Sequence, residues 1–173
     1  MASGNTLAYW MAEDGMPPTT AAASLDRRLG GSTPAEQFLV VDFDGGSADE
    51  SYDFRGIMPQ NYAAGGVTLR LWWGATTATT GDVRLGLAFR AIEDDAEDID
   101  AAHTYDFNEV TDTVPNLSGE YTAAVITFTD GVDMDSVGAG DPFILRIRRE
   151  ASDTILDTMA GDMELLAIEM RET

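Results

Sequence analysis

Short runs in which apolar and polar residues alternate dominate this sequence. The stretch "GVTLRLWWGATTATTGDVRLGLAFR" (66–90) places an apolar residue at every second position from Val67 to Trp73, and again from Val83 to Phe89. A period of two residues is typical of a half-buried β-strand, which packs one face on a core and turns the other outward. No segment sustains the 3.6-residue period of a helix. The sequence therefore predicts an all-β protein.

The same pattern recurs along the whole chain, with Gly, Pro, Asp and Thr between the runs. The predicted strands are 5–11, 22–27, 37–43, 51–57, 67–73, 83–90, 103–110, 121–129, 143–150 and 163–171. We expect a jelly-roll-like antiparallel β-sandwich of about eight to ten strands, whose two sheets share one core. The two strands of 66–90 form either a hairpin or a sandwich corner. Helix is expected only as a turn or two, in 94–102 or 132–140.

The chain length favours one domain. A chain of 173 residues can bury roughly 70% of its unfolded surface around a single core. We therefore expect one β-sandwich domain over residues 1–173. Residues 1–36 form either an N-terminal arm or the first strands packed on the sandwich.

The charge balance excludes several partners. The sequence has 31 acidic residues against ten basic ones, all of them arginine, for a net charge of −21. Phosphate backbones would be repelled, so nucleic acid is not an expected partner. No apolar run approaches the roughly 20 residues that span a bilayer, and the N-terminus lacks signal-peptide features. We expect a soluble protein that neither contacts membranes nor is exported by that route.

Arginines stand opposite the apolar positions of three predicted strands. Planar guanidinium groups bind carboxylates well, and the two small residues between Arg84 and Arg90 leave room for close contact. In so acidic a protein, a second copy is the nearest carboxylate-rich partner. If the strands share a sheet, one face carries a predicted interface of Arg70, Trp72, Arg84, Gly86, Ala88, Arg90, Arg146 and Arg148. The alternative is that a loop or the N-terminal segment covers this face.

No residue pattern indicates catalysis or a cofactor. The chain has no cysteine and one histidine, His103, which is expected at the surface or in a capping role rather than in a triad. A carboxylate pair for glycoside hydrolysis has no fixed spacing in sequence, so the presence of 31 acidic residues neither supports nor excludes such a pair. The acidic loop 92–102 offers weak calcium candidates at Asp94, Asp95, Asp98 and Asp100, although a solvated acidic loop explains them better. We expect neither an enzyme nor a bound cofactor.

Several segments together resemble small β-sandwich virion proteins of tailed bacteriophages. The most distinctive are "FRGIMPQNY" (54–62), "GGVTLRLWW" (65–73) and "AGDPFILRIRR" (139–149), and the similarity extends over nearly the whole chain. The resemblance implies a structural part of the particle exterior, such as a capsid decoration or cement protein, a head spike or a fibre module. It also implies a homotrimer that docks on the major capsid protein or another virion protein.

Three functions are thus open at the level of sequence. The leading expectation is a non-enzymatic capsid decoration or cement protein that acts through self-assembly. The alternative is a carbohydrate- or receptor-binding β-sandwich module of a tail fibre or spike. For that role Trp72 is the available aromatic, because Trp73 and Trp10 are expected to face the core. An enzyme is the third reading.

Overall fold

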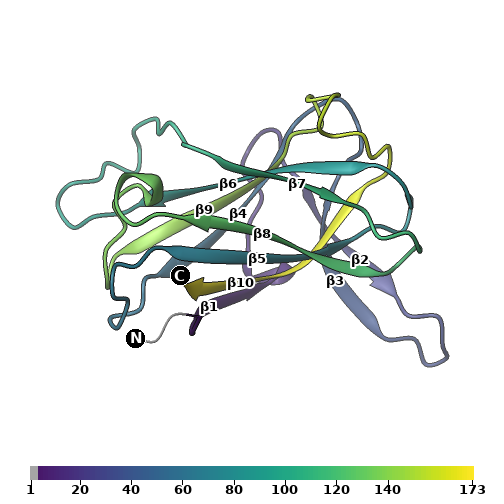
Figure 1. The fold of residues 1–173 in the computed structure, drawn as a ribbon, viewed down its shortest axis with the longest axis horizontal. Coiled ribbons are helices and arrows are strands. Elements are labelled where there is room, and N and C mark those ends of the chain that lie inside the picture. Colours follow the sequence, from purple (N-terminus) through teal and green to yellow (C-terminus); the bar gives the residue numbers. More distant parts are fainter. Residues whose placement is uncertain (1–3) are drawn as a thin grey trace.

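The computed structural model describes residues 4–173 as two antiparallel β-sheets packed face to face (Figure 1). The strands are β1 (Thr6–Met11), β2 (Ser24–Leu29), β3 (Gln37–Phe43), β4 (Glu50–Ile57), β5 (Val67–Gly74), β6 (Asp82–Ala91), β7 (Asn108–Thr113), β8 (Tyr121–Phe128), β9 (Pro142–Arg149) and β10 (Met163–Glu172). This confirms the predicted all-β sandwich of eight to ten strands.

One sheet has six strands and the other has four. The six-stranded sheet runs β2-β3-β10-β5-β8, with β1 also paired to β10, and the four-stranded sheet runs β4-β9-β6-β7. The N-terminal strands β1 and β2 thus belong to the six-stranded sheet. Helix is limited to two 3₁₀ turns, Ala12–Asp14 and Val132–Met134. Among residues 4–173, no helix has the length and apolar character needed to cross a membrane.

The core forms where the alternating apolar residues of both sheets meet. Leu69 and Leu71 of β5 face Leu87 of β6 and Leu145 of β9 across the sandwich, and all four are fully buried. Trp73 is also buried and donates a 2.8 Å hydrogen bond from Nε1 to the Asp112 carboxylate. Burial of apolar surface is the main stabilising term of such a fold.

A charged side chain also lies inside the sandwich. In β9 the inward positions are Phe143, Leu145, Ile147 and Arg149, and Arg149 is fully buried. Its guanidinium binds both carboxylate oxygens of Asp157, at 3.0 and 2.8 Å. The pair ties the 150–162 connection to the end of the sandwich.

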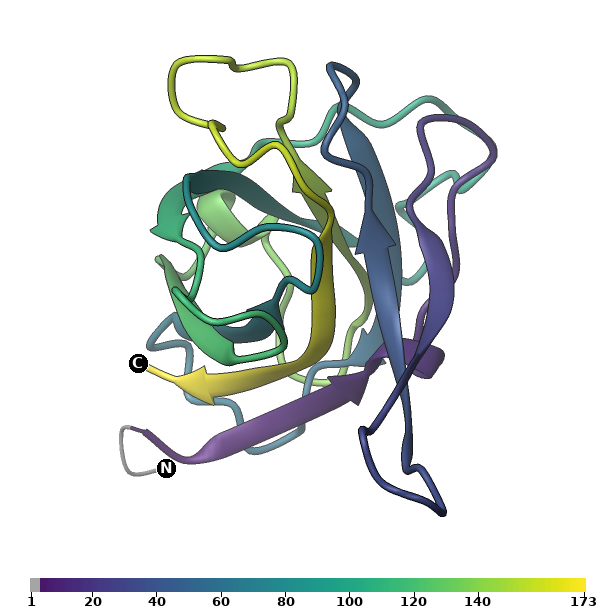
Figure 2. The same ribbon diagram turned by 90° about the vertical axis from the view of Figure 1, so that its right-hand side faces the viewer.

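The β2–β3 hairpin reaches beyond the body of the molecule. Figures 1 and 2 both show the tip of this hairpin, residues 30–36, projecting away from the packed sheets. Strand β2 lies at the end of the six-stranded sheet. Its residues are mostly exposed.

Candidate functional site

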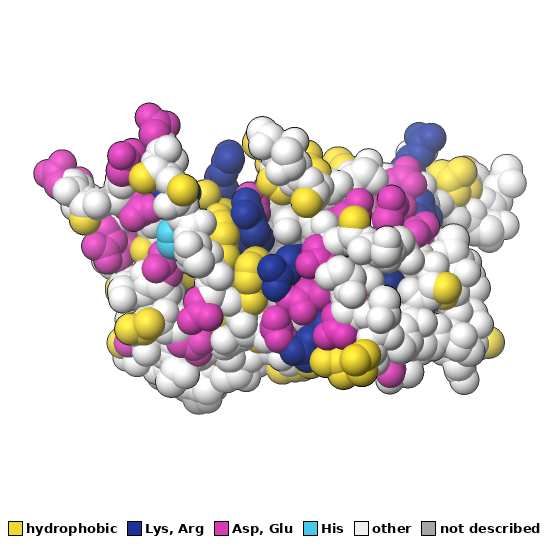
Figure 3. Space-filling model, turned by 90° about the horizontal axis from the view of Figure 1, so that it is seen from above, with side chains coloured by type: hydrophobic (Ala, Val, Ile, Leu, Met, Phe, Trp, Pro, Cys, Tyr) yellow, Lys and Arg dark blue, Asp and Glu magenta, His cyan; other side chains and the backbone are white. Residues whose placement is uncertain are grey.

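Four of the predicted interface arginines share one face. Arg84 and Arg90 of β6 and Arg146 and Arg148 of β9 point away from the core, on the outer side of the four-stranded sheet. In the face shown in Figure 3, arginine side chains form a row bordered by acidic ones. Gly86 pairs with Arg148 and Ala88 with Arg146 in the β6–β9 ladder.

Arg70 and Trp72 do not belong to that face, and the prediction of a single shared face is wrong for them. Their strand, β5, pairs with β10 and β8, whereas β6 pairs with β9 and β7. The connection 75–81 therefore crosses from one sheet to the other. The sandwich-corner alternative is confirmed, and the outward positions of β5 and β6 lie on opposite sides of the molecule.

Acidic groups of the same chain bind each arginine of the four-stranded sheet. Arg146 forms two 2.7 Å hydrogen bonds to Asp53, and these bonds raise the pKa of Arg146 above its ordinary value. Arg90 binds Glu97 at 3.0 and 2.8 Å. The remaining two arginines pair within the chain as well: Arg84 with Glu109 and Arg148 with Glu150. Burial raises the pKa of the Glu150 carboxyl, and Arg148 opposes the shift.

An extended segment, the strap His103–Phe107, lies over part of this arginine row. Tyr105 stacks with the Arg146 guanidinium at 4.2 Å from the ring centre, and Phe107 stacks with Arg148 at 3.9 Å. A Cβ atom on Gly86 would come within 3.1 Å of the Phe107 ring. Phe107 of the same chain therefore occupies the space that Gly86 leaves open. Burial raises the pKa of Tyr105.

The remaining acidic and histidine candidates do not form a centre. Within residues 4–173, no three His, Asp or Glu side chains are grouped so as to hold a metal ion. The Asp98 carboxylate accepts a hydrogen bond from the Asp100 amide, and its carbonyl accepts one from Arg90. His103 lies 3.7 Å from the Asp135 carboxylate and packs edge-on against Tyr105.

The outer face of the six-stranded sheet carries an exposed aromatic platform. Trp72 pairs with Ala123 of β8 on one side and with Ala167 of β10 on the other, so small side chains flank the indole. Its residue surface is 39% exposed. The Arg70 guanidinium lies 5.2 Å from the centre of the indole ring. Trp72 is therefore partly accessible, with the Arg70 guanidinium over its ring.

A groove opens on the same face, beside Trp72. Its volume is about 340 Å³, and its walls are Leu29, Gly30, Phe38, Thr76, Gly119, Tyr121 and Leu166, together with the charged Arg28 and Glu164. Tyr121 pairs with Gly74, two positions beyond Trp72 on β5. Same-face residues on a strand lie about 7 Å apart. The groove therefore lies on the same face as Trp72, one same-face position farther along β5.

Ion pairs organise the polar end of the groove. The Arg28 guanidinium lies 2.9 Å from Glu164 and 2.8 Å from Asp42, and it also contacts Asp26. Burial lowers the pKa of Arg28, but the bonds to these carboxylates outweigh that effect and raise it. Glu164 also accepts a 3.1 Å hydrogen bond from the Thr76 amide. Burial raises the pKa of Asp42, and Arg28 opposes that shift.

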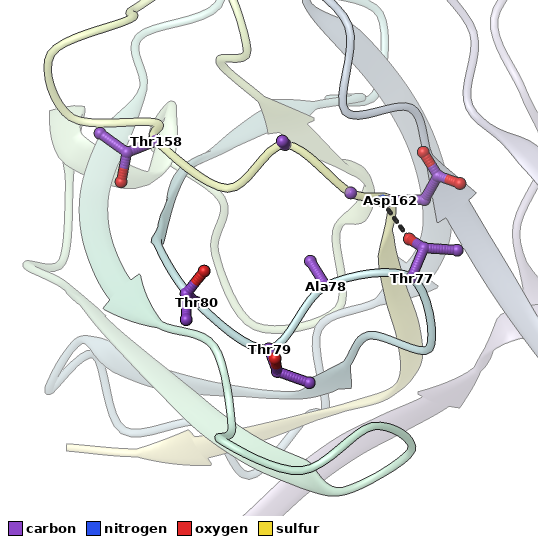
Figure 4. Close-up of a pocket in the computed structure, with 8 residues that line it drawn as sticks. Thr77, Ala78, Thr79, Thr80, Thr158 and Asp162 are labelled. Atoms are coloured by element: carbon purple, nitrogen blue, oxygen red, sulfur yellow. Dashed lines mark hydrogen bonds between the residues drawn. The ribbon is translucent and has the colours of Figure 1, made fainter.

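Two further hollows lie at one end of the sandwich. The one in Figure 4, about 490 Å³, is lined mainly by threonine hydroxyls and small residues from 77–80 and 158–162. The Asp162 amide donates a 2.9 Å hydrogen bond to the Thr77 hydroxyl across it. The adjoining hollow is about 550 Å³ and shares Thr158 and Ala160. Neither lining includes an aromatic side chain, so we favour the groove as the site.

Sequence reasoning predicted an exposed Trp72 but missed the groove. Phe38 and Arg28 pair across β2 and β3, yet Glu164 and Tyr121 come from strands far along the chain. Phe38 lies on the opposite side of β3 from the buried Val41 and Phe43, but Val40 on its own side is buried too, so the pattern alone did not mark Phe38 as exposed. The convergence of four strands on one groove required the sheet order.

Comparisons with known proteins define the class of fold. No family model and no curated protein matches the chain. Among solved structures, the CBM22-1 xylan-binding domain of Paenibacillus barcinonensis Xyn10C matches with a TM-score of 0.53 at 10% identity, over 99% of this chain and 96% of that one. A carbohydrate-binding module of Cellvibrio mixtus lichenase 5A, in complex with cellotriose, matches with a TM-score of 0.52 at 13% identity, over 98% and 99% of the two chains.

Part of a larger enzyme has a similar fold. An isomalto-dextranase of Arthrobacter globiformis T6, complexed with panose, matches with a TM-score of 0.53 at 19% identity, over 94% of this chain but 22% of the enzyme. These likenesses define the fold as a β-sandwich of the kind found in carbohydrate-binding modules.

Proposed function

We propose that this protein is a carbohydrate-binding module that binds a glycan along the outer face of its six-stranded sheet. The observation that carries the proposal is the exposed Trp72, flanked by Ala123 and Ala167, on the same face as a groove walled by Phe38 and Tyr121. The similarity of fold to carbohydrate-binding modules supports it.

The groove and the platform offer a sugar chain both kinds of contact that it needs. The apolar C–H faces of a pyranose ring stack on flat aromatic side chains, here Trp72, Phe38 and Tyr121. Sugar hydroxyls can accept hydrogen bonds from the partly exposed Arg28, which the buried Glu164 holds in place. Apolar walls with a few convergent polar groups are typical of ligand sites.

The polar groups of the groove are held in place before a ligand arrives. Arg28 is fixed by Asp42 and Glu164, and Glu164 is fixed by the Thr76 amide. A preorganised site loses less conformational entropy on binding. This arrangement suits recognition, and we assign these carboxylates a positioning and hydrogen-bonding role rather than a catalytic one.

A virion location stays a prediction from the sequence resemblance, and glycan binding does not depend on it. A receptor-binding module of a tail fibre or spike would combine the two. The docking on a capsid protein likewise stays a prediction, and the predicted homotrimer is an alternative to the assembly proposed below.

Isothermal titration calorimetry tests the proposal. Soluble xylan, cellotriose and panose are suitable probes, because the similar structures are a xylan-binding domain and complexes with cellotriose and with panose. Binding by at least one probe is expected, and Trp72→Ala or Phe38→Ala should each weaken it by about tenfold, or ~1.4 kcal/mol.

Ile57→Ala is the control. Ile57 is an exposed apolar residue on β4, which belongs to the four-stranded sheet and not to the proposed binding face. Its removal should leave the affinity unchanged. Absence of binding across a broad glycan array, or full affinity in the Trp72→Ala variant, would contradict the proposal.

A further inference from the structure

Strand β2 presents a free main-chain edge. It pairs with β3 on one side, and no strand within residues 4–173 pairs with the other side. The Gly30 amide donates a 2.8 Å hydrogen bond to the Glu36 carbonyl, so these two residues form a hydrogen-bonded pair. Along the β2–β3 ladder, hydrogen-bonded and non-hydrogen-bonded pairs alternate from this point. By that alternation, the main-chain groups of Leu25, Arg27 and Leu29 point away from β3.

The contact of the Arg27 amide agrees with this assignment. That N–H donates a 2.7 Å hydrogen bond to Oδ1 of Asp26, not to β3. Asp26 is an exposed side chain, so a strand that approached the edge could replace this contact with a main-chain hydrogen bond. The edge is therefore satisfied locally but remains open to pairing.

Apolar side chains lie along the same edge. Leu25 and Leu29 are 45% and 62% exposed, and they lie on the same side of β2 as Arg27. Leu39 and Phe38 of the adjoining strand are also exposed. Large exposed apolar side chains that gather on one projecting element mark an interaction surface.

The order of residues in β2 is self-complementary about Arg27. When two copies of "LDRRL" (25–29) run antiparallel with Arg27 at the twofold axis, Leu25 lies opposite Leu29 of the second copy. Asp26 then lies opposite Arg28 of the second copy, so opposite charges meet on both sides of the axis. This register is also the one that brings the free main-chain groups of residues 25, 27 and 29 into hydrogen-bonding positions.

The register has one unfavourable contact. The two Arg27 side chains approach each other at the axis. Each has a 3.3 Å hydrogen bond to Gln37 of its own copy, and each is exposed, so water screens the repulsion.

Local charge favours this element over the rest of the surface as a contact between copies. The hairpin 24–42 carries two arginines and three acidic residues, whereas the whole chain has a net charge of −21. Because the hairpin tip projects from the body (Figure 2), part of the pairing surface is set apart from the acidic bulk of the molecule. Moderate ionic strength screens the repulsion that remains.

We propose that the protein forms a homodimer by antiparallel pairing of β2 with β2 of a second copy, which joins the two six-stranded sheets into one. The interface is isologous, so each side-chain contact away from the axis occurs twice. The proposal concerns self-association and does not require glycan binding, although Arg28 and Leu29 belong to both surfaces.

Sedimentation equilibrium of the full chain, over a concentration series at 0.15 M NaCl, tests this proposal. The expected mass is that of a dimer of the 18.6 kDa chain. Leu25→Lys and Leu29→Glu should each weaken association by about tenfold, because each change acts twice in the symmetric interface. The double variant should regain affinity, since it places opposite charges across the axis.

Ile155→Lys is the control, since Ile155 is exposed in the 150–162 connection, outside the β2–β3 hairpin. It should dimerise like the unaltered chain. Circular dichroism and the thermal midpoint of every variant verify folding. A chain that remains monomeric up to about 1 mM, a trimer, or a dimer that Leu25→Lys leaves intact would overturn the proposal.

Discussion

Replacing Asp157 by asparagine would leave the buried Arg149 guanidinium without its counterion while preserving the shape of the side chain. Arg149 makes two hydrogen bonds to Asp157 and three to the carbonyls of Phe43, Gly161 and Met159, at 3.2, 2.7 and 2.6 Å. The carbonyls satisfy the remaining donors but do not neutralise the charge. An uncompensated charge in a dry interior is among the most destabilising single changes.

The expected loss follows from that burial. Breaking a buried ion pair by removing one partner costs about 3–5 kcal/mol. For a chain of this size, each kcal/mol shifts the thermal midpoint by about 2–4 °C, so Asp157→Asn should lower it by roughly 6–20 °C. Urea denaturation followed by circular dichroism gives the free energy of unfolding directly.

Asp106→Asn is the matched control, because it makes the same change of charge at an exposed position of the strap. It should shift stability by less than about 0.5 kcal/mol. A loss below about 1 kcal/mol for Asp157→Asn would refute the view that this carboxylate compensates a buried charge.

Three further outcomes are expected. Leu145→Ala should cost about 2–5 kcal/mol in urea denaturation, because Leu145 is fully buried; a negligible loss would contradict its place in the core. Burial raises the pKa of Glu50, although a hydrogen bond from the Asp44 amide opposes this. Its contribution to stability therefore becomes less favourable as pH rises through the folded-state pKa. Glu50→Gln should accordingly raise the thermal midpoint at pH 7 and lose that advantage in acid, and a lower midpoint at pH 7 would count against it. Arg84→Glu with Arg90→Glu should lower the midpoint by opposing their acidic partners; unchanged stability with lost assembly would instead favour an interface.

The period-two pattern predicted the strands well because burial of one face is a local property of the sequence. The predicted strand 37–43 agrees with β3, and most other boundaries differ by one or two residues. The exception is 103–110, since β7 begins at Asn108. There the sequence of the strap alternates as in a strand. Its side chains Tyr105 and Phe107 stack on arginines, and its main chain belongs to no strand. Side-chain alternation alone does not distinguish these two environments.

Sheet membership was harder to predict than strand position. The sequence of residues 75–81 does not indicate whether the chain turns back beside β5 or crosses to the other sheet. Because it crosses, Trp72 and Arg84 lie on opposite sides of the molecule. Arg149 is a different case. The alternation of β9 placed it inward, but a charged residue is expected outside unless its counterion is known. That counterion, Asp157, lies in a connection without strand structure.

The neighbouring Trp72 and Trp73 give this chain two built-in optical probes that report on different environments. Trp73 is buried with its indole N–H bound to Asp112, and Trp10 is buried with its N–H bound to the Arg55 carbonyl. Trp72 alone of the three tryptophans faces water. A neutral quencher such as acrylamide should therefore reach Trp72 selectively in the folded protein, while iodide would be kept away by the acidic surface. Fluorescence that is quenched in this way follows events at the sheet surface, and the unquenched remainder follows the integrity of the core, without any added label.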